Sequence, residues 1–167
     1  MRTGRASSLL ERKIKNPGEL KKEISRLKSK GKVVVFTNGC FDLIHYGHVK
    51  YLEAAKRKGD ILVVAVNSDG SVRRIKGKMR PLVNEKFRAG VIAALESVDY
   101  VIIFEEDTPL KLIKSLKPCI LVKGSDWQEE NIVGRDFVKS YGGKVMTIKL
   151  IKGFSTSNLL KKIATSF

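Results

Sequence analysis

The chain has 167 residues, of which 43% are hydrophobic, so it can bury one ordinary core and is too short for two large domains. No window reaches the roughly 18 consecutive apolar residues that a membrane span needs, and residues 1–15 lack the apolar stretch of a secretory signal. We therefore expect a cytoplasmic protein with no membrane partner. Two cysteines are too few for a disulfide framework.

The charge balance is strongly basic, with 33 Lys and Arg against 17 Asp and Glu and a net charge of +16. Charge alone leaves three interpretations open. It is typical of nucleic-acid binding, which releases counterions from phosphates. It also suits a site that holds several phosphates and steers anions toward itself. The third interpretation is a solvated, lysine-rich surface, as in a protein from a hot environment.

The N-terminal part predicts a basic extension, residues 1–31, with one helix. Residues 1–15 resemble a loose basic lead-in. From Pro17 to residue 30 the apolar residues Leu20, Ile24 and Leu27 recur at helical spacing. Pro17 suits the first turn of a helix, and Gly31 suits its end.

From residue 32 onward, apolar runs alternate with helical patterns. The runs predict strands over residues 32–37, 61–66, 100–104, 120–122 and 144–148. The patterns between them predict helices over residues 47–58, 84–97, 109–116, 132–141 and 155–163, and residues 73–80 form a basic loop. Runs that are apolar throughout are typical of parallel strands buried on both faces, joined by right-handed crossovers.

The predicted fold class is therefore α/β, a doubly wound five-stranded parallel sheet of Rossmann-like type in a single domain. Ligands of such sheets bind outside the carboxyl ends of the strands, although the fold by itself names no reaction. Cys40 follows one predicted strand and Cys119 precedes another, so the two thiols lie at opposite ends of the sheet and cannot bridge.

The two histidines of the chain, His45 and His48, stand three residues apart where the first strand leads into a helix. A helix N-terminus attracts phosphate through its N–H groups, and two imidazoles there can donate hydrogen bonds to developing charge. Two alternatives stay open at this point. One is a metal site, although no third ligand lies nearby in sequence; the other is a structural pair.

The segment from Gly39 to His48 reads G-x-F-D-x-x-H-x-G-H and resembles the HxGH nucleotidyltransferase family. The similarity extends over residues 32–163, which makes residues 32–165 the nucleotidyltransferase domain. It is strongest toward the adenylyltransferase domains of ADP-heptose synthases. The segments that carry it are FTNGCFDLIHYGHV (36–49), VNSDGSVRRIKG (66–77), RPLVNEKFRAGVIAAL (80–95), VDYVIIFEEDTPL (98–110), LVKGSDW (121–127) and GFSTSNLLKKI (153–163).

The resemblance implies transfer of AMP from ATP to a heptose 1-phosphate, giving an ADP-sugar and pyrophosphate for lipopolysaccharide core synthesis. It implies that His45 and His48 are catalytic. It implies a nucleotide-binding set of Gly39, Cys40, Phe41, Asp42, Gly47, Ser155 and Thr156, in which Asp42 fixes the loop. Ser155 can equally be a plain N-cap. Glycerol-phosphate cytidylyltransferases share fewer segments and carry Arg-Thr where this chain has Leu150-Ile151.

Outside the histidine motif, five charged residues are candidates for binding phosphates or substrate: Lys76, Arg80, Arg88, Lys123 and Asp126. Each has an alternative. The segment 73–80 can be a solvated charge run, Glu85 and Arg88 can be a surface pair, and residues 123–127 can be a simple loop. Trp127 covers the sugar or only packs.

The same resemblance implies Mg²⁺ bound with ATP, and the sequence shows no all-protein metal cage. It also implies a possible homodimer and a separate kinase that supplies the phosphorylated sugar. We expect no specific nucleic-acid partner. Two other functions remain open: a cytidylyltransferase for a polyol phosphate, and a basic nucleic-acid-binding module, which would leave both histidines without a role.

Overall fold

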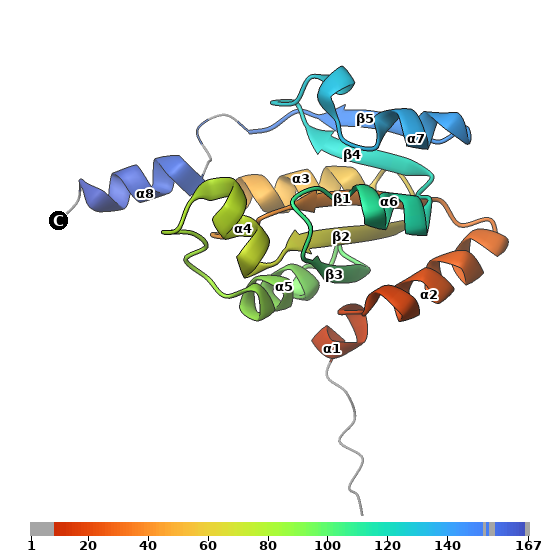
Figure 1. Cartoon of the computed structure of the whole chain (residues 1–167), viewed down its shortest axis with the longest axis horizontal. Helices are drawn as coiled ribbons and strands as arrows, with labels where there is room; N and C mark the ends of the chain where they lie inside the picture. Colours follow the sequence, from red (N-terminus) through yellow and green to blue (C-terminus); the bar gives the residue numbers. More distant parts are fainter. Residues whose placement is uncertain (1–8, 152, 154–155, 166–167) are drawn as a thin grey trace, which may run out of the picture.

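The protein is described by a computed structural model over residues 9–151, 153 and 156–165. Its centre is a five-stranded parallel sheet with helices on both faces (Figure 1). The strands are β1 (Val34–Gly39), β2 (Ile61–Asn67), β3 (Tyr100–Phe104), β4 (Ile120–Gly124) and β5 (Lys144–Ile148). Their order is β3-β2-β1-β4-β5, so the predicted doubly wound sheet is confirmed.

The register of the central strands explains why their sequences are apolar throughout. Val34 pairs with Ile61 of β2, and Val35 pairs with Ile120 of β4. Successive side chains of a strand point to opposite faces. Val35 accordingly packs in the core on one face of the sheet, whereas Val34 and Phe36 pack in the core on the other. Both faces are covered, and neither needs polar side chains.

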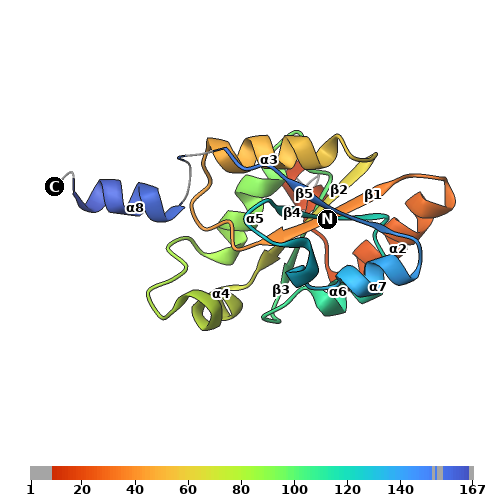
Figure 2. The ribbon, with the colours of Figure 1, turned by 90° about the horizontal axis from the view of Figure 1, so that it is seen from above.

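The helices divide between these two cores. The element bounds are α1 (Leu9–Lys13), α2 (Pro17–Ser29), α3 (Tyr46–Lys56), α4 (Asp69–Lys76), α5 (Glu85–Ala94), α6 (Leu110–Leu116), η1 (Glu129–Asn131), α7 (Arg135–Ser140) and α8 (Thr156–Ala164). Buried residues of α3 and α5 fill one core, and those of α2, α6 and α7 fill the other. Seen from above, α8 extends away from the sheet (Figure 2). Within the described residues, no helix combines the length and apolarity needed to cross a membrane.

The N-terminal segment is more ordered than its sequence predicted. The loose lead-in is wrong from Leu9 onward, because α1 begins there and Ile14 forms a parallel bridge with Val101 of β3. The segment therefore holds two helices and not one. The predicted helix α2 is confirmed: Asn16 caps it with a capping box, and its Leu20 and Ile24 are fully buried.

The second correction concerns the basic segment after β2. Residues 73–76 were predicted as loop, but they form the last turns of α4. Ser68 begins this helix, because its side chain accepts a hydrogen bond from the Ser71 N–H. Gly77, with φ of 96°, ends it. The helix therefore delivers Lys76 to the carboxyl edge of the sheet on a rigid element.

Candidate active site

A cleft opens at the carboxyl ends of β1 and β4, where the strand order reverses. This is the place that the doubly wound topology predicts for a ligand. The cleft consists of two adjoining hollows of about 430 and 580 Å³. Both hollows are lined by Asn38, Gly39, Cys40, Phe41, His48, Lys76, Lys123, Asp126, Trp127 and Thr156.

The loop after β1 is built around the Phe41 ring. This residue adopts a left-handed conformation, with φ of 47°, and its side chain is buried. Glycine at position 39 leaves room for this ring, since a Cβ there would lie 3.1 Å from a ring atom of Phe41 and would crowd it. The ring in turn contacts His48 edge to face, with 5.5 Å between centroids. Gly39 and Phe41 thus support the histidine motif as well as the cleft wall.

The two histidines begin α3 and lie against each other. His45 is the N-cap residue, in an extended conformation, and His48 is three residues further on. Their rings stack with centroids 3.9 Å apart and an interplanar angle of 26°. The His45 backbone N–H donates to Nδ1 of His48 at 3.4 Å. A neutral His48 therefore carries its proton on Nε2 and can donate from that atom.

Burial sets the protonation state of this pair. It lowers the pKa of His45, and it lowers the pKa of His48 to about 4, with a smaller contribution from the neighbouring His45. Both imidazoles are therefore neutral at pH 7 before a ligand binds. Gly47 between them is buried and lines the same hollow. The arrangement offers neutral hydrogen-bond donors at a helix N-terminus.

Lys123 is the cation of β4 in the cleft. Its Nζ donates to the Asn38 carbonyl at 3.2 Å and lies 5.4 Å from the centroid of the Trp127 ring. Burial lowers the pKa of Lys123 to about 8, and the nearby Asp126 opposes that shift. The predicted residues Lys76, Lys123 and Asp126 therefore meet in one cleft. Trp127 is half exposed and covers the Lys123 side of the wall, so it does not belong to the core.

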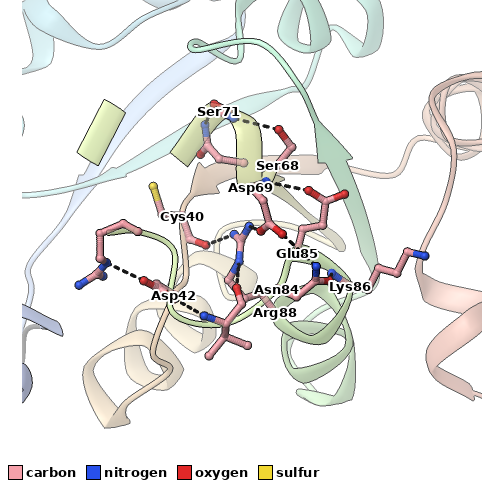
Figure 3. Close-up of polar contacts among 12 residues, drawn as sticks. Cys40, Asp42, Ser68, Asp69, Ser71, Asn84, Glu85, Lys86 and Arg88 are labelled. Atoms are coloured by element: carbon pink, nitrogen blue, oxygen red, sulfur yellow. Dashed lines mark hydrogen bonds and ion pairs between the residues drawn. The ribbon is translucent and has the colours of Figure 1, made fainter. Parts of the chain in front are cut away.

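Asp42 anchors the segment that follows α4, as Figure 3 shows. Its buried carboxylate accepts from the Leu82 N–H at 2.8 Å and the Val83 N–H at 2.9 Å. The same carboxylate pairs with Nε of Arg80 at 2.7 Å. Arg80 reaches the wall of the second hollow in this pairing. The interpretation that Asp42 fixes a loop agrees with these contacts.

Arg88 occupies a different place from the one that its sequence suggested. It is not a surface partner of Glu85, because its side chain is fully buried and pairs with Asp69 at 2.8 Å. It lines neither hollow. Its guanidinium also donates to the carbonyls of Val83 and Cys40. In this structure the Arg88 guanidinium is bonded to the segments behind the cleft wall.

The C-terminal residues close the first hollow. Thr156 lines both hollows and donates from Oγ1 to the Leu43 carbonyl at 3.5 Å. Ser155, the other predicted nucleotide ligand, lies outside the described residues. Leu150 and Ile151 give the first hollow an apolar wall. Within the described part of the chain, no three His, Cys, Asp or Glu residues group as a metal site.

Comparison with known proteins identifies the family of this chain. A family model described as Cytidylyltransferase-like matches residues 36–164. The chain belongs to the cytidylyltransferase-like family. The match covers the sheet except for the first two residues of β1, and it includes the histidine motif and α8. The resemblance to nucleotidyltransferases that rested on short segments is therefore confirmed.

Curated relatives of this cytidylyltransferase-like chain include two bacterial proteins named Bifunctional protein HldE. That of Geobacter metallireducens is 55% identical over 155 residues, which cover 93% of this chain and 32% of the relative. That of Trichlorobacter lovleyi is 56% identical over 151 residues, which cover 90% of this chain and 31% of the relative. The chain therefore spans about a third of the length of these relatives.

A solved structure shares the cytidylyltransferase-like fold. It is the lipopolysaccharide core biosynthesis protein from Thermoplasma volcanium, with 32% identity and a TM-score of 0.61. The alignment covers 74% of this chain and all of that one.

Sequence reasoning missed several cleft residues of this cytidylyltransferase-like domain. Tyr51 lines the first hollow and shares a hydrogen bond with Thr37 Oγ1 at 2.7 Å. Its signal was present, because it follows His48 by three residues on the same helix face. Residues 107–109 line the second hollow and come after β3. Their signal was their position after a strand, at the edge where ligands bind.

Proposed function

We propose that this chain is an adenylyltransferase that transfers AMP from ATP to a sugar 1-phosphate, specifically a heptose 1-phosphate. The observation that carries the proposal is the stacked His45–His48 pair at the N-terminus of α3, in a cleft that also presents Lys76 and Lys123. The class of acceptor rests on the segments shared with ADP-heptose synthases. The relatives named Bifunctional protein HldE and the lipopolysaccharide core biosynthesis protein support the same class.

In the proposed reaction, a phosphate oxygen of the acceptor attacks the α-phosphorus of ATP in line. A new O–P bond forms, the bond from the α-phosphorus to the bridging oxygen breaks, and pyrophosphate leaves with that electron pair. The nucleophile is already anionic, so no general base is needed. The protein contributes positioning and stabilisation of charge.

The cleft residues divide this work between them. The neutral imidazoles of His45 and His48 and the N–H groups of α3 donate to the phosphates where negative charge grows. Lys76 and Lys123 neutralise the phosphates from the two sides of the cleft. Mg²⁺ bound with ATP would supply further charge neutralisation, and this ion prefers phosphate and water oxygens to a protein cage. The carboxylate of Asp126, which lines both hollows, suits its hydrated shell.

The choice of ATP follows from the resemblance and from one departure. Cytidylyltransferases of the family carry Arg-Thr where Leu150 and Ile151 form an apolar wall here. An apolar wall suits contact with a purine ring, and it cannot supply the charge of the arginine that it replaces. We further propose that a separate kinase activity makes the sugar phosphate, that the enzyme works in the cytoplasm where ATP is available, and that it forms a homodimer.

A direct assay tests the proposal. The protein is incubated with Mg²⁺, each nucleoside triphosphate in turn, and a panel of sugar 1-phosphates and polyol phosphates, and pyrophosphate release is measured. We expect turnover with ATP and heptose 1-phosphate and a higher kcat/KM for ATP than for CTP. A preference for CTP with a polyol phosphate would assign the chain to the glycerol-phosphate cytidylyltransferases. Absence of pyrophosphate with every pair would remove the proposal.

A further inference from the structure

The peptide bond between Cys40 and Phe41 is held in an orientation that its own backbone does not favour. Phe41 has φ of 47°, and left-handed values are unfavourable for a bulky side chain. Rotating this peptide by half a turn would bring φ of Phe41 to roughly −130°, an ordinary extended value. Some contact must therefore hold the peptide as it is.

The guanidinium of Arg88 makes that contact. It donates from one terminal nitrogen to the Cys40 carbonyl, from Nε to the Val83 carbonyl at 2.8 Å, and from the other terminal nitrogen to Asp69 Oδ1 at 2.8 Å (Figure 3). The side chain is fully buried, so water does not compete for these bonds. A rigid, planar fork with three fixed acceptors determines where the Cys40 carbonyl points.

The direction of that carbonyl fixes the direction of the next N–H. The peptide is trans, so the Phe41 N–H points away from the Cys40 carbonyl and hence away from Arg88. Phe41 lines both hollows of the cleft, whereas Arg88 lines neither. No residue in the described part of the chain accepts a hydrogen bond from this N–H. The donor is thus left for a ligand.

We propose that Arg88 is a positioning residue that aims the Phe41 N–H at a phosphate of the nucleotide. It acts through the Cys40 carbonyl and touches no substrate. If the peptide turned over, the cleft would present a carbonyl oxygen to the phosphates in place of a donor, and anion binding would weaken. The identity of the anion as a nucleotide phosphate rests on the proposed function.

Arg88→Lys is the decisive variant. Lysine keeps the charge that Asp69 needs but cannot bond three acceptors in one plane. Glu85→Ala is the matched control, because Glu85 accepts from the Asp69 N–H at 2.7 Å in the same cluster and does not contact Cys40. The probe is pyrophosphate. Its Kd is measured by calorimetry, and its effect on the Phe41 amide is measured by NMR of protein labelled with ¹⁵N-phenylalanine. Melting temperature is measured alongside.

We expect the Phe41 amide signal of the unmodified protein to shift strongly with pyrophosphate. In Arg88→Lys that shift should be lost and the Kd should rise by roughly tenfold or more. Glu85→Ala should lose comparable thermal stability while the Kd stays within about twofold of the unmodified value. A Phe41 amide that ignores pyrophosphate in the unmodified protein, or an Arg88→Lys protein with normal affinity, would overturn the proposal.

A second pair of variants decides the matter if Arg88→Lys does not fold. Phe41→Gly and Phe41→Ala both remove the ring, but only glycine accepts the positive φ without strain. We expect Phe41→Gly to bind pyrophosphate more tightly than Phe41→Ala and to be at least as stable as that variant. Equal or better binding by the alanine variant would contradict the strained peptide.

These measurements are separate from the test of the proposed function. Pyrophosphate binding needs neither acceptor nor turnover. Binding that depends on Arg88, together with no ADP-sugar product, would remove the function and keep the inference. Normal turnover with a Phe41 amide that does not respond to pyrophosphate would remove the inference and keep the proposed function.

Discussion

Replacing His48 by alanine tests the chemistry assigned to the cleft. The change removes an Nε2 donor from the N-terminus of α3 and leaves the sheet untouched. Loss of one donor of this kind costs about 10²–10³ in rate, or roughly 3–4 kcal/mol of transition-state stabilisation. The ring is only partly buried, and it contacts the His45 ring by stacking, the edge of Phe41, and the His45 backbone N–H through Nδ1. We therefore expect a loss of about 1 kcal/mol in unfolding free energy, or about 2–4 °C in Tm.

The assay measures kcat, KM for ATP and Tm on the same preparations. His48→Ala and His45→Ala should lower kcat more than they raise KM, because the donors act mainly on the transition state. The double variant should lose less than the product of the two single losses, since both rings act on one phosphate chain. Lys50→Ala is the control, because Lys50 lies on the same helix and pairs with Glu53 at the surface. It should behave as the unmodified protein.

Turnover within a few-fold of the unmodified protein in both single variants would refute the catalytic assignment. A structural role predicts a different pattern, in which Tm collapses while the folded fraction keeps its activity. A metal role predicts activity that a chelator removes and Mg²⁺ does not restore. The three measurements separate these outcomes.

Three further predictions concern charge. The pKa of His48 is about 4 in the fold and about 6.5 when unfolded, so between these values the unfolded state binds the proton more readily. The contribution of neutral His48 to the unfolding free energy should therefore be complete above pH 6.5 and fall by about 1 kcal/mol toward pH 4. His48→Gln should flatten this urea-unfolding profile, and an unchanged slope would contradict it. Because the pKa of Lys123 is about 8, affinity for ATP measured by calorimetry should fall as pH rises through 8. Lys123→Arg should remove that dependence, and a fall that persists would assign it to another group. Asp42→Asn should cost about 3 kcal/mol in unfolding free energy, because the buried carboxylate pairs with Arg80; a loss below about 1 kcal/mol would refute the anchor.

The sheet could be predicted from the sequence because its signal is local. The residues of β3 and β5 match their predicted ranges, since each apolar run is bounded by charged or small residues. Helix α4 was missed for the same kind of reason. Half of its eight residues are charged and few are apolar, so its sequence resembles a solvated run. Its start signal, the hydroxyl of Ser68 three residues before Ser71, was present but weak.

The residues of the site likewise differ in whether local sequence could predict their place. The histidine motif lies within ten consecutive positions, so the family resemblance that implies its chemistry could be recognised without the fold. Arg88 could not be placed in this way. Its partners Asp69 and Cys40 are 19 and 48 residues away, and only the folded chain brings them together. Local reasoning offered Glu85 as its partner, because i, i+3 pairs are all that a helical pattern can show.

The basic candidates outside the motif therefore do two different kinds of work. Arg80 and Arg88 are held by Asp42 and Asp69, so their charge is largely neutralised and their geometry is fixed. Lys76 and Lys123 line the cleft and bring their charge to it. An arginine fork is suited to the first task, and a compact ammonium suffices for the second. Exchange of arginine for lysine at positions 80 and 88 should consequently disturb the shape of the cleft, whereas exchange of lysine for arginine at 76 and 123 should preserve its field. The count of 33 Lys and Arg residues thus overstates the cationic side chains available to a substrate, because some of them, such as Arg80 and Arg88, are paired with carboxylates beside the cleft.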